Sequence, residues 1–168
     1  NSKNLSEVKE KFSMKTKELL LKLHDILLAV HEKDVVIGDM NNNNILVNDN
    51  NEIKLIDTDS MQFGNYTCAT FVPKFTPPEL LDVTQGSIQF KQKRTKMSDW
   101  YAFMVIAMRL LTNTDPYGGV LKINNQIVSL GERIEKHITV FDKNVIYPAT
   151  AIPLQEMPRS ILEVFFEV

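Results

Sequence analysis

The amino-acid sequence predicts a mainly α-helical fold of the α+β class, in which small β-hairpins accompany the helices. Apolar residues recur at three- and four-residue intervals through residues 6–32, as in an amphipathic helix. Residues 98–112 are apolar nearly all the way round, which is typical of a buried central helix. Between these two segments, short β-prone runs alternate with turn-forming residues.

The first half of the chain contains a long helix and then a hairpin. The helix is expected over residues 6–32, where lysines and glutamates fill the face opposite one apolar stripe made of Leu19, Leu23, Leu27 and Val30. The β-prone runs follow at 35–37, 44–47 and 53–56. The sequence NDNNE at 48–52 predicts the hairpin turn between the last two runs.

The second half is expected to be helical around the central helix. The sequence TPPELL at 76–81 predicts a helical start with Thr76 as its N-cap and prolines in the first turn. The basic run KQKRTK at 91–96 predicts an exposed loop, and NTDPYGG ends the central helix. Two further helices are expected near residues 131–137 and from Pro158 onward.

Composition excludes several classes of protein. A chain of 168 residues fits one domain, and its net charge of −2 argues against a nucleic-acid-binding surface. The longest apolar run, 100–108, is interrupted at Arg109 and is too short to cross a bilayer, so no membrane partner is expected. Because Cys68 is the single cysteine, no intrachain disulfide can form, and we expect a reducing, cytoplasmic location.

The chain begins without an initiator Met, as NSKNLSEVKEKF, and ends while the last amphipathic pattern is still running. We therefore expect residues 1–168 to be a piece of a longer polypeptide that is cut at both ends.

Three polar residues form a candidate site. Asp39 and Asn44 bracket an asparagine-rich loop, and Asp57 follows the strand at 53–56, eighteen residues after Asp39. A hairpin between them would bring the three side chains to one end of the sheet. Oxygen ligands from Asn44 and Asp57 suit Mg²⁺, while Asp39 would orient a hydroxyl or receive its proton. Taken alone, the loop is better explained as an asparagine-rich turn.

Four motifs carry a resemblance to the C-terminal lobe of the protein kinase family. GDMNNNNILV resembles the catalytic loop H-R-D-x-x-x-x-N, with Asp39 and Asn44 at its Asp and Asn. IKLIDTDS resembles the strand that leads into the D-F-G motif, with Asp57 as the metal-binding Asp. FTPPELL resembles the A-P-E motif, with Glu79 as its acid. SDWYAFMVIAMRLLTNTDPYGG resembles the central buried helix of that lobe, with Asp99 at its start. The tail is similar to a divergent bacterial branch of the family.

This resemblance implies an ATP-dependent phosphotransferase that moves the γ-phosphate of ATP to Ser or Thr hydroxyls of a protein substrate. Asp39 would be the catalytic residue, and Asn44 and Asp57 would hold Mg²⁺ against the ATP phosphates. Asp59 is a further candidate metal ligand, while Glu79 and Asp99 would have structural roles.

The chain departs from the family pattern at several positions. Ile37 and Gly38 replace the usual His and Arg, so a phosphorylated activation segment would lose its usual partner. Asn41 replaces a Lys, and Thr58 and Asp59 replace the Phe and Gly of D-F-G. No glycine-rich loop, strand Lys or partner Glu precedes the catalytic loop. We therefore expect the parts that clamp the ATP phosphates to be on a missing N-terminal segment, on a partner chain, or lost, and we expect little phosphate transfer by this chain alone.

Two other functions remain open on the sequence. A small-molecule phosphotransferase of the aminoglycoside-kinase type also has a G-D-x-x-x-x-N loop, and Gly38 fits it well, although TPPELL and SDWYAF do not. A pseudokinase that serves as an interaction module is favoured by Asn41 and by the sequence DTD, and is disfavoured by the joint presence of Asp39, Asn44 and Asp57.

Overall fold

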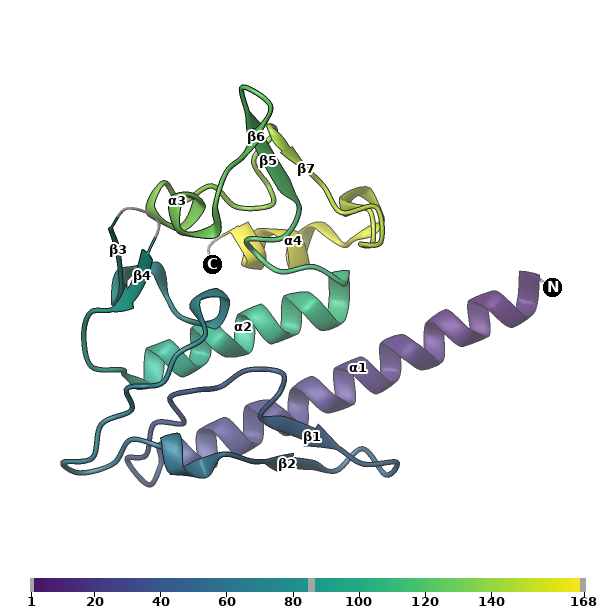
Figure 1. Cartoon of the computed structure of the whole chain (residues 1–168). Coiled ribbons are helices and arrows are strands. Elements are labelled where there is room, and N and C mark those ends of the chain that lie inside the picture. Colours follow the sequence, from purple (N-terminus) through teal and green to yellow (C-terminus); the bar gives the residue numbers. More distant parts are fainter. Residues whose placement is uncertain (1, 85–86, 167–168) are drawn as a thin grey trace.

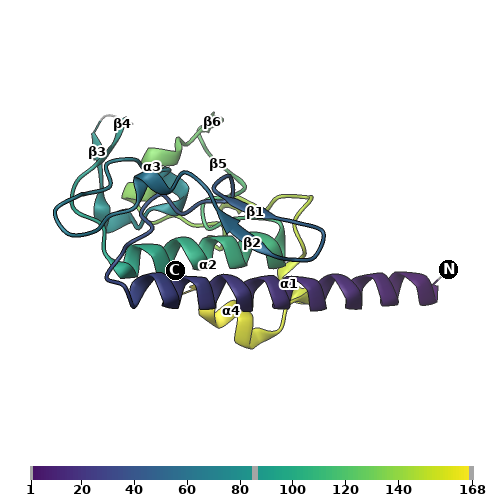
Figure 2. The same ribbon diagram turned by 90° about the horizontal axis from the view of Figure 1, so that it is seen from below.

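Helices α1 (Ser2–His31) and α2 (Lys96–Thr112) lie side by side in the computed structural model, which describes residues 2–84 and 87–166 (Figures 1 and 2). Leu23 and Leu27 of α1 pack against Val105 and Ile106 of α2 in one apolar cluster. Both predicted helices are confirmed, and α1 begins four residues before the predicted start. The mixed α+β composition is confirmed as well.

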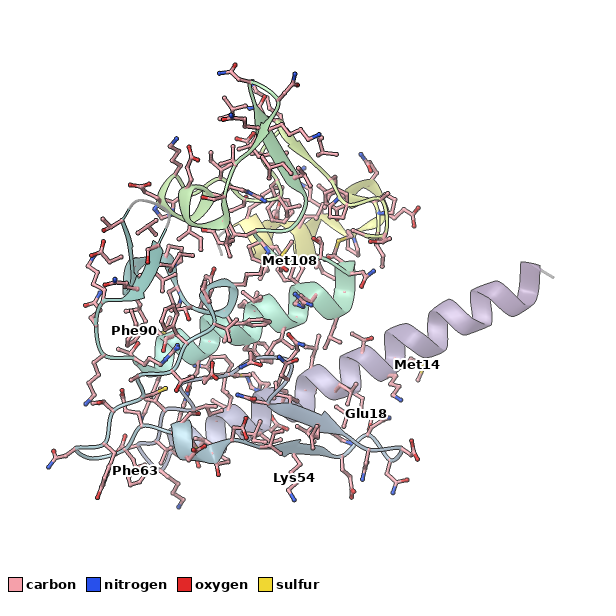
Figure 3. All side chains as sticks on the ribbon, viewed as in Figure 1. Met14, Glu18, Lys54, Phe63, Phe90 and Met108 are labelled. Carbon is pink, nitrogen blue, oxygen red and sulfur yellow. The ribbon has the colours of Figure 1, made fainter. Side chains whose placement is uncertain are left out.

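Helix α2 is apolar all round because it lies between two apolar clusters. One cluster contains Val105 and joins α2 to α1. The other contains Met108, which is completely buried and lies on the side of α2 toward β5 and α4 (Figure 3). Burial on both sides removes most of the apolar surface in the middle of α2 from water, so α2 is the centre of the fold.

The predicted hairpin forms between β1 (Ile45–Val47) and β2 (Ile53–Leu55), which pair antiparallel with Leu46 opposite Lys54. The predicted turn joins them, and the Asn48 side chain accepts hydrogen bonds from the backbone N–H groups of residues 50 and 52. Residues 35–37 do not form a strand of their own, because Val36 makes only an isolated bridge with Gln62.

The helical start predicted at residues 76–81 is wrong. A single 3₁₀ turn, η3 (Pro78–Leu80), leads directly into β3 (Leu81–Thr84), which pairs antiparallel with β4 (Ser87–Phe90). The Thr76 hydroxyl caps no helix and instead donates to the Val72 carbonyl. The apolar residues of the hairpin alternate and pack on Tyr117 and α3, so tertiary burial outweighs the local proline signal.

The basic run at 91–96 is only partly the exposed loop that was predicted. Arg94 is 2% exposed, and its guanidinium donates to the Thr70 carbonyl at 2.8 Å and lies over the Phe90 ring. Lys96 already belongs to α2. Arg94 therefore fastens the irregular segment before η2 (Pro73–Phe75) to the β3–β4 hairpin.

The strands that follow α2 in the chain lie on the other side of α2 from α1 (Figure 1). Strands β5 (Val120–Ile123), β6 (Gln126–Ile127) and β7 (Val145–Ile146) form an antiparallel sheet in the order β6-β5-β7, which was not predicted. Helices α3 (Leu130–Glu135) and α4 (Arg159–Phe166) confirm the last two predicted helices. Two further 3₁₀ turns are η1 (Thr58–Ser60) and η4 (Leu154–Glu156). Within the described ranges, no helix combines the length and apolarity that crossing a membrane requires.

Candidate functional site

Asp39, Asn44 and Asp57 line one small hollow at the end of the β1–β2 hairpin. Asn44 directly precedes β1, and Asp57 lies two residues after the end of β2. The backbone N–H of Ile56 donates to the Asn44 carbonyl at 3.0 Å, which extends the strand pairing to the hollow. The hairpin thus places the three side chains at the same end of the sheet.

The Asn44 amide holds the loop against Asp39. Its Nδ2 donates to the Asp39 carbonyl at 2.9 Å and to Asp39 Oδ2 at 3.3 Å. No described residue donates a hydrogen bond to Asn44 Oδ1 or Asp39 Oδ1. One oxygen of each side chain therefore remains available to a ligand.

Asp57 has a left-handed backbone conformation, with φ at 52°. Few residues other than glycine adopt this conformation, and such positions are concentrated at functional sites. The N–H and hydroxyl of Ser60 both donate to the Asp57 carbonyl and hold the backbone there. The Asp57 carboxylate is exposed and accepts no hydrogen bond from the described residues.

The oxygens of Asn44 and Asp57 fit a magnesium ion by their chemistry. An amide oxygen and a carboxylate are hard ligands, and Mg²⁺ uses few protein ligands because it keeps water or phosphate oxygens. The hollow has a volume of about 10 Å³, which is room for about one water-sized species. Its lining contains no Lys or Arg, and in the described ranges no group of three or more His, Cys, Asp or Glu could hold a metal.

Asp99 anchors the start of the loop from inside the protein. This carboxylate is fully buried on α2 and accepts from the N–H groups of Ile37 at 2.7 Å and Gly38 at 2.9 Å. His31 Nε2, at the end of α1, lies 2.9 Å from Asp99 Oδ2. Because a carboxylate only accepts, this nitrogen carries the proton. One side chain thus joins α1, α2 and the loop, and the sequence did not indicate the contribution of His31.

Gly38 occupies a place that admits no side chain. Its φ is +81°, and a Cβ atom there would lie 2.8 Å from Cys68 Sγ and 3.0 Å from the Ser60 carbonyl oxygen. The departure from the family pattern at Gly38 therefore has a steric cause in this fold.

Asp59 and Glu79 lie outside the hollow. Asp59 is exposed in η1, and Glu79 is exposed in η3. Within the described ranges, the Glu79 carboxylate forms no ion pair. It lies near enough to Tyr117 to act on it: burial, and then the charge of Glu79, raises the pKa of Tyr117 to about 12.

Comparisons with known proteins identify the family. The family described as Protein kinase domain matches residues 2–159. The chain is 29% identical over 151 residues to Protein kinase YegI of Escherichia coli (strain K12), an alignment that covers 82% of this chain and 22% of that protein. It is 33% identical over 105 residues to Protein kinase C-like 1 of Saccharomyces cerevisiae (strain ATCC 204508 / S288c), covering 56% of this chain and 8% of that protein. The chain thus spans less than a quarter of the length of either relative. The predicted family resemblance is confirmed.

Proposed function

The chain belongs to the protein kinase domain family, and from this premise we propose that it is the C-terminal lobe of an ATP-dependent protein kinase that phosphorylates Ser or Thr hydroxyls of a protein substrate. One observation carries the proposal. The three oxygen-bearing side chains that the family motifs single out, Asp39, Asn44 and Asp57, line the same hollow. A location in the cytoplasm belongs to the same proposal and is supported by the single, buried Cys68.

Asp39 is the proposed catalytic residue. Its Oδ2 is held by Asn44, while no described residue donates to its Oδ1. This free oxygen is available to accept the proton of a substrate hydroxyl or to orient that hydroxyl toward the phosphate. The bond from Asn44 fixes the carboxylate before the substrate arrives, which favours such a positioning role.

Asn44 and Asp57 are the proposed magnesium ligands. When bound, Mg²⁺ supplies positive charge against the phosphate groups of ATP. Asn44 Oδ1 and the Asp57 carboxylate carry no competing hydrogen bonds from the described residues, so both are available to the cation. Asp57 is preferred to Asp59, which does not line the hollow. Because the lining contains no Lys or Arg, we assign the clamping of the phosphates to an N-terminal lobe or a partner chain.

Three variants of the natural full-length protein test these roles. We expect Asp39→Asn to lower turnover by about 10²- to 10⁴-fold, the usual range for a positioned acid or base, and to leave Mg²⁺–ATP affinity nearly unchanged. Asp57→Asn should weaken Mg²⁺–ATP binding by about tenfold or more, because it removes a charged ligand from a hard cation. Asn43→Ala is the control, because Asn43 is exposed in the same loop and does not line the hollow.

Turnover is measured by transfer of labelled phosphate to protein, and affinity by calorimetry. Full turnover by the Asp39→Asn protein would remove Asp39 from the catalytic role. If the unmodified full-length protein phosphorylates no protein substrate at all, the kinase proposal is wrong and the pseudokinase interpretation replaces it.

A further inference from the structure

A second pocket, of about 340 Å³, opens beside the loop that carries Asp39. Asn42 contributes the loop side of this pocket, and the other lining residues come from the end of α2 and the segment that follows it. Among them, Ile106 and Leu110 are apolar, and Arg109 and Asp115 carry charge. The volume suits one side chain and part of a peptide backbone.

The charges around Asp115 do not cancel. Asp115 is 4% exposed, and its Oδ2 accepts from Arg109 Nη1 at 2.9 Å and from Lys74 Nζ at 3.2 Å. Its Oδ1 accepts from the N–H of Tyr117 at 3.1 Å. Two cations therefore share one carboxylate, which leaves this group of three side chains with one net positive charge.

The surplus charge is presented by Arg109. Its side chain is 40% exposed. Its guanidinium lies 5.7 Å from the centre of the Phe75 ring, and this contact restrains the orientation of the guanidinium plane. Within the described residues, only Nη1 donates a hydrogen bond, so Nε and Nη2 are available to a ligand. A guanidinium with two free donors suits a carboxylate or a phosphate, which it can bind through two parallel hydrogen bonds.

We propose that this pocket binds an anionic side chain of the protein substrate, a carboxylate or a phosphate, and so selects the sequence around the phosphorylated hydroxyl. The inference rests on the kinase function proposed above and names a substrate class for it. Arg109 is the specificity-determining residue, and Asp115 and Lys74 position it. Ile106 and Leu110 supply apolar contact for the rest of the substrate segment.

The chain geometry limits where the anionic side chain lies in the substrate. Asn42 follows Asp39 by three residues, which span at most about 10 Å. An extended substrate advances about 3.3 Å per residue. The anionic residue is therefore expected within about three positions of the acceptor hydroxyl.

The test uses the natural full-length protein and peptides that contain one acceptor Ser. Each peptide carries Glu, phosphoserine, Gln or Lys at one position within three residues of the acceptor. We expect kcat/KM for the Glu or phosphoserine peptide to exceed that for the Gln peptide by about tenfold at the best position, as for a charge-assisted hydrogen bond, with Lys lowest. A preference for phosphoserine alone identifies phosphate as the ligand, and a preference for both shows that a carboxylate suffices.

Arg109 variants separate charge recognition from a structural role. Arg109→Lys should keep only part of the Glu preference, because it retains the charge but loses the two parallel donors. Arg109→Gln should reduce the Glu-to-Gln ratio to about one, and Arg109→Glu should favour Lys, because the preference follows the sign of the charge. Each ratio is measured within one protein, so a partly unfolded variant does not change it. Lys122→Ala is the control, because Lys122 is an exposed cation on β5 that does not line the pocket.

The outcomes keep the two proposals apart. Phosphorylation of all peptides at equal rates would overturn the specificity pocket and leave the kinase function intact, as would a Glu preference that survives Arg109→Glu. Phosphorylation of no peptide and no protein by the unmodified enzyme would overturn the kinase function itself.

Discussion

Gly38 determines the backbone geometry directly before the proposed catalytic Asp39. Its positive φ disfavours any residue with a side chain, and a Cβ atom at this position would also lie too close to Cys68. The Arg of the family motif cannot be accommodated there without movement of Cys68 or of the Ser60 backbone. The consequence is that this loop is held by packing and by Asp99, not by a charge at position 38.

Gly38→Ala is therefore expected to lower the free energy of unfolding by more than an alanine in an uncrowded left-handed position does. Backbone strain of this kind costs about 1–3 kcal/mol, and the contact with Cys68 adds to it. Gly64→Ala is the matched control, because Gly64 also has a positive φ, 53°, but nothing lies within 4 Å of its missing Cβ. Urea unfolding of the full chain measures both. Equal losses would show that the contact with Cys68 is unimportant.

Among the helices and strands, the sequence predicted those that have a periodic apolar pattern or a local turn motif. The long apolar periods of α1 and α2 indicated both helices, and the turn residues between β1 and β2 indicated that hairpin. Strands β6 and β7 have two residues each and no readable period, and β7 pairs with a strand more than twenty residues earlier. Their existence depends on tertiary contacts that a local pattern does not contain.

In the candidate site, too, the sequence predicted the residues that are close in the chain and missed the contacts between distant segments. Motif spacing was enough to select Asp39, Asn44 and Asp57, because a loop and a hairpin hold them close in sequence. His31 meets Asp99 across 68 residues, so only the folded chain reveals that pair. Arg109 is a charged residue in an otherwise apolar segment, and a charge in such a place needs a partner. Nothing in the sequence identified Asp115 as that partner.

Asp99 links three elements, so its replacement should loosen all of them together. An asparagine at position 99 keeps one acceptor oxygen, so Asp99→Asn leaves either the Gly38 N–H or both the Ile37 N–H and His31 without an acceptor. A buried donor that is left without its acceptor costs about 1–3 kcal/mol. We expect a loss of this order in urea unfolding, together with faster amide exchange at Ile37 and Gly38.

A second Asp–His pair offers the control. Asp25 lies 3.2 Å from His24 on the surface of α1, and the Asp25 side chain is mostly exposed. Asp25→Asn should change the free energy of unfolding by less than about 0.5 kcal/mol, because exposed pairs contribute little. If Asp99→Asn were equally mild, the buried network would not be what holds the loop.

At the scale of the whole molecule, the described fold contains the proposed catalytic and metal-binding groups but little that would hold ATP. The hollow is the size of one water molecule, and no cation lines it. The first part of α1 extends well beyond the other elements in both views of the ribbon (Figures 1 and 2). Phosphate transfer depends chiefly on positioning the reactants and neutralising the phosphate charge, so the proposed function requires further groups from outside this lining.

The 168-residue chain on its own is therefore expected to bind Mg²⁺–ATP weakly and to transfer little phosphate. The measurement is incorporation of labelled γ-phosphate into a protein substrate of the natural full-length protein. The Asp39→Asn full-length protein gives the background rate of incorporation, and an assay in which Mg²⁺ is removed by a chelator gives the blank. Because the chain retains Asp39, Asn44 and Asp57 but lacks a cationic clamp in the hollow, its rate should not exceed that background. Robust labelling by the chain alone would mean that another part of this fold clamps the phosphates, and the division of roles between two lobes would then be wrong.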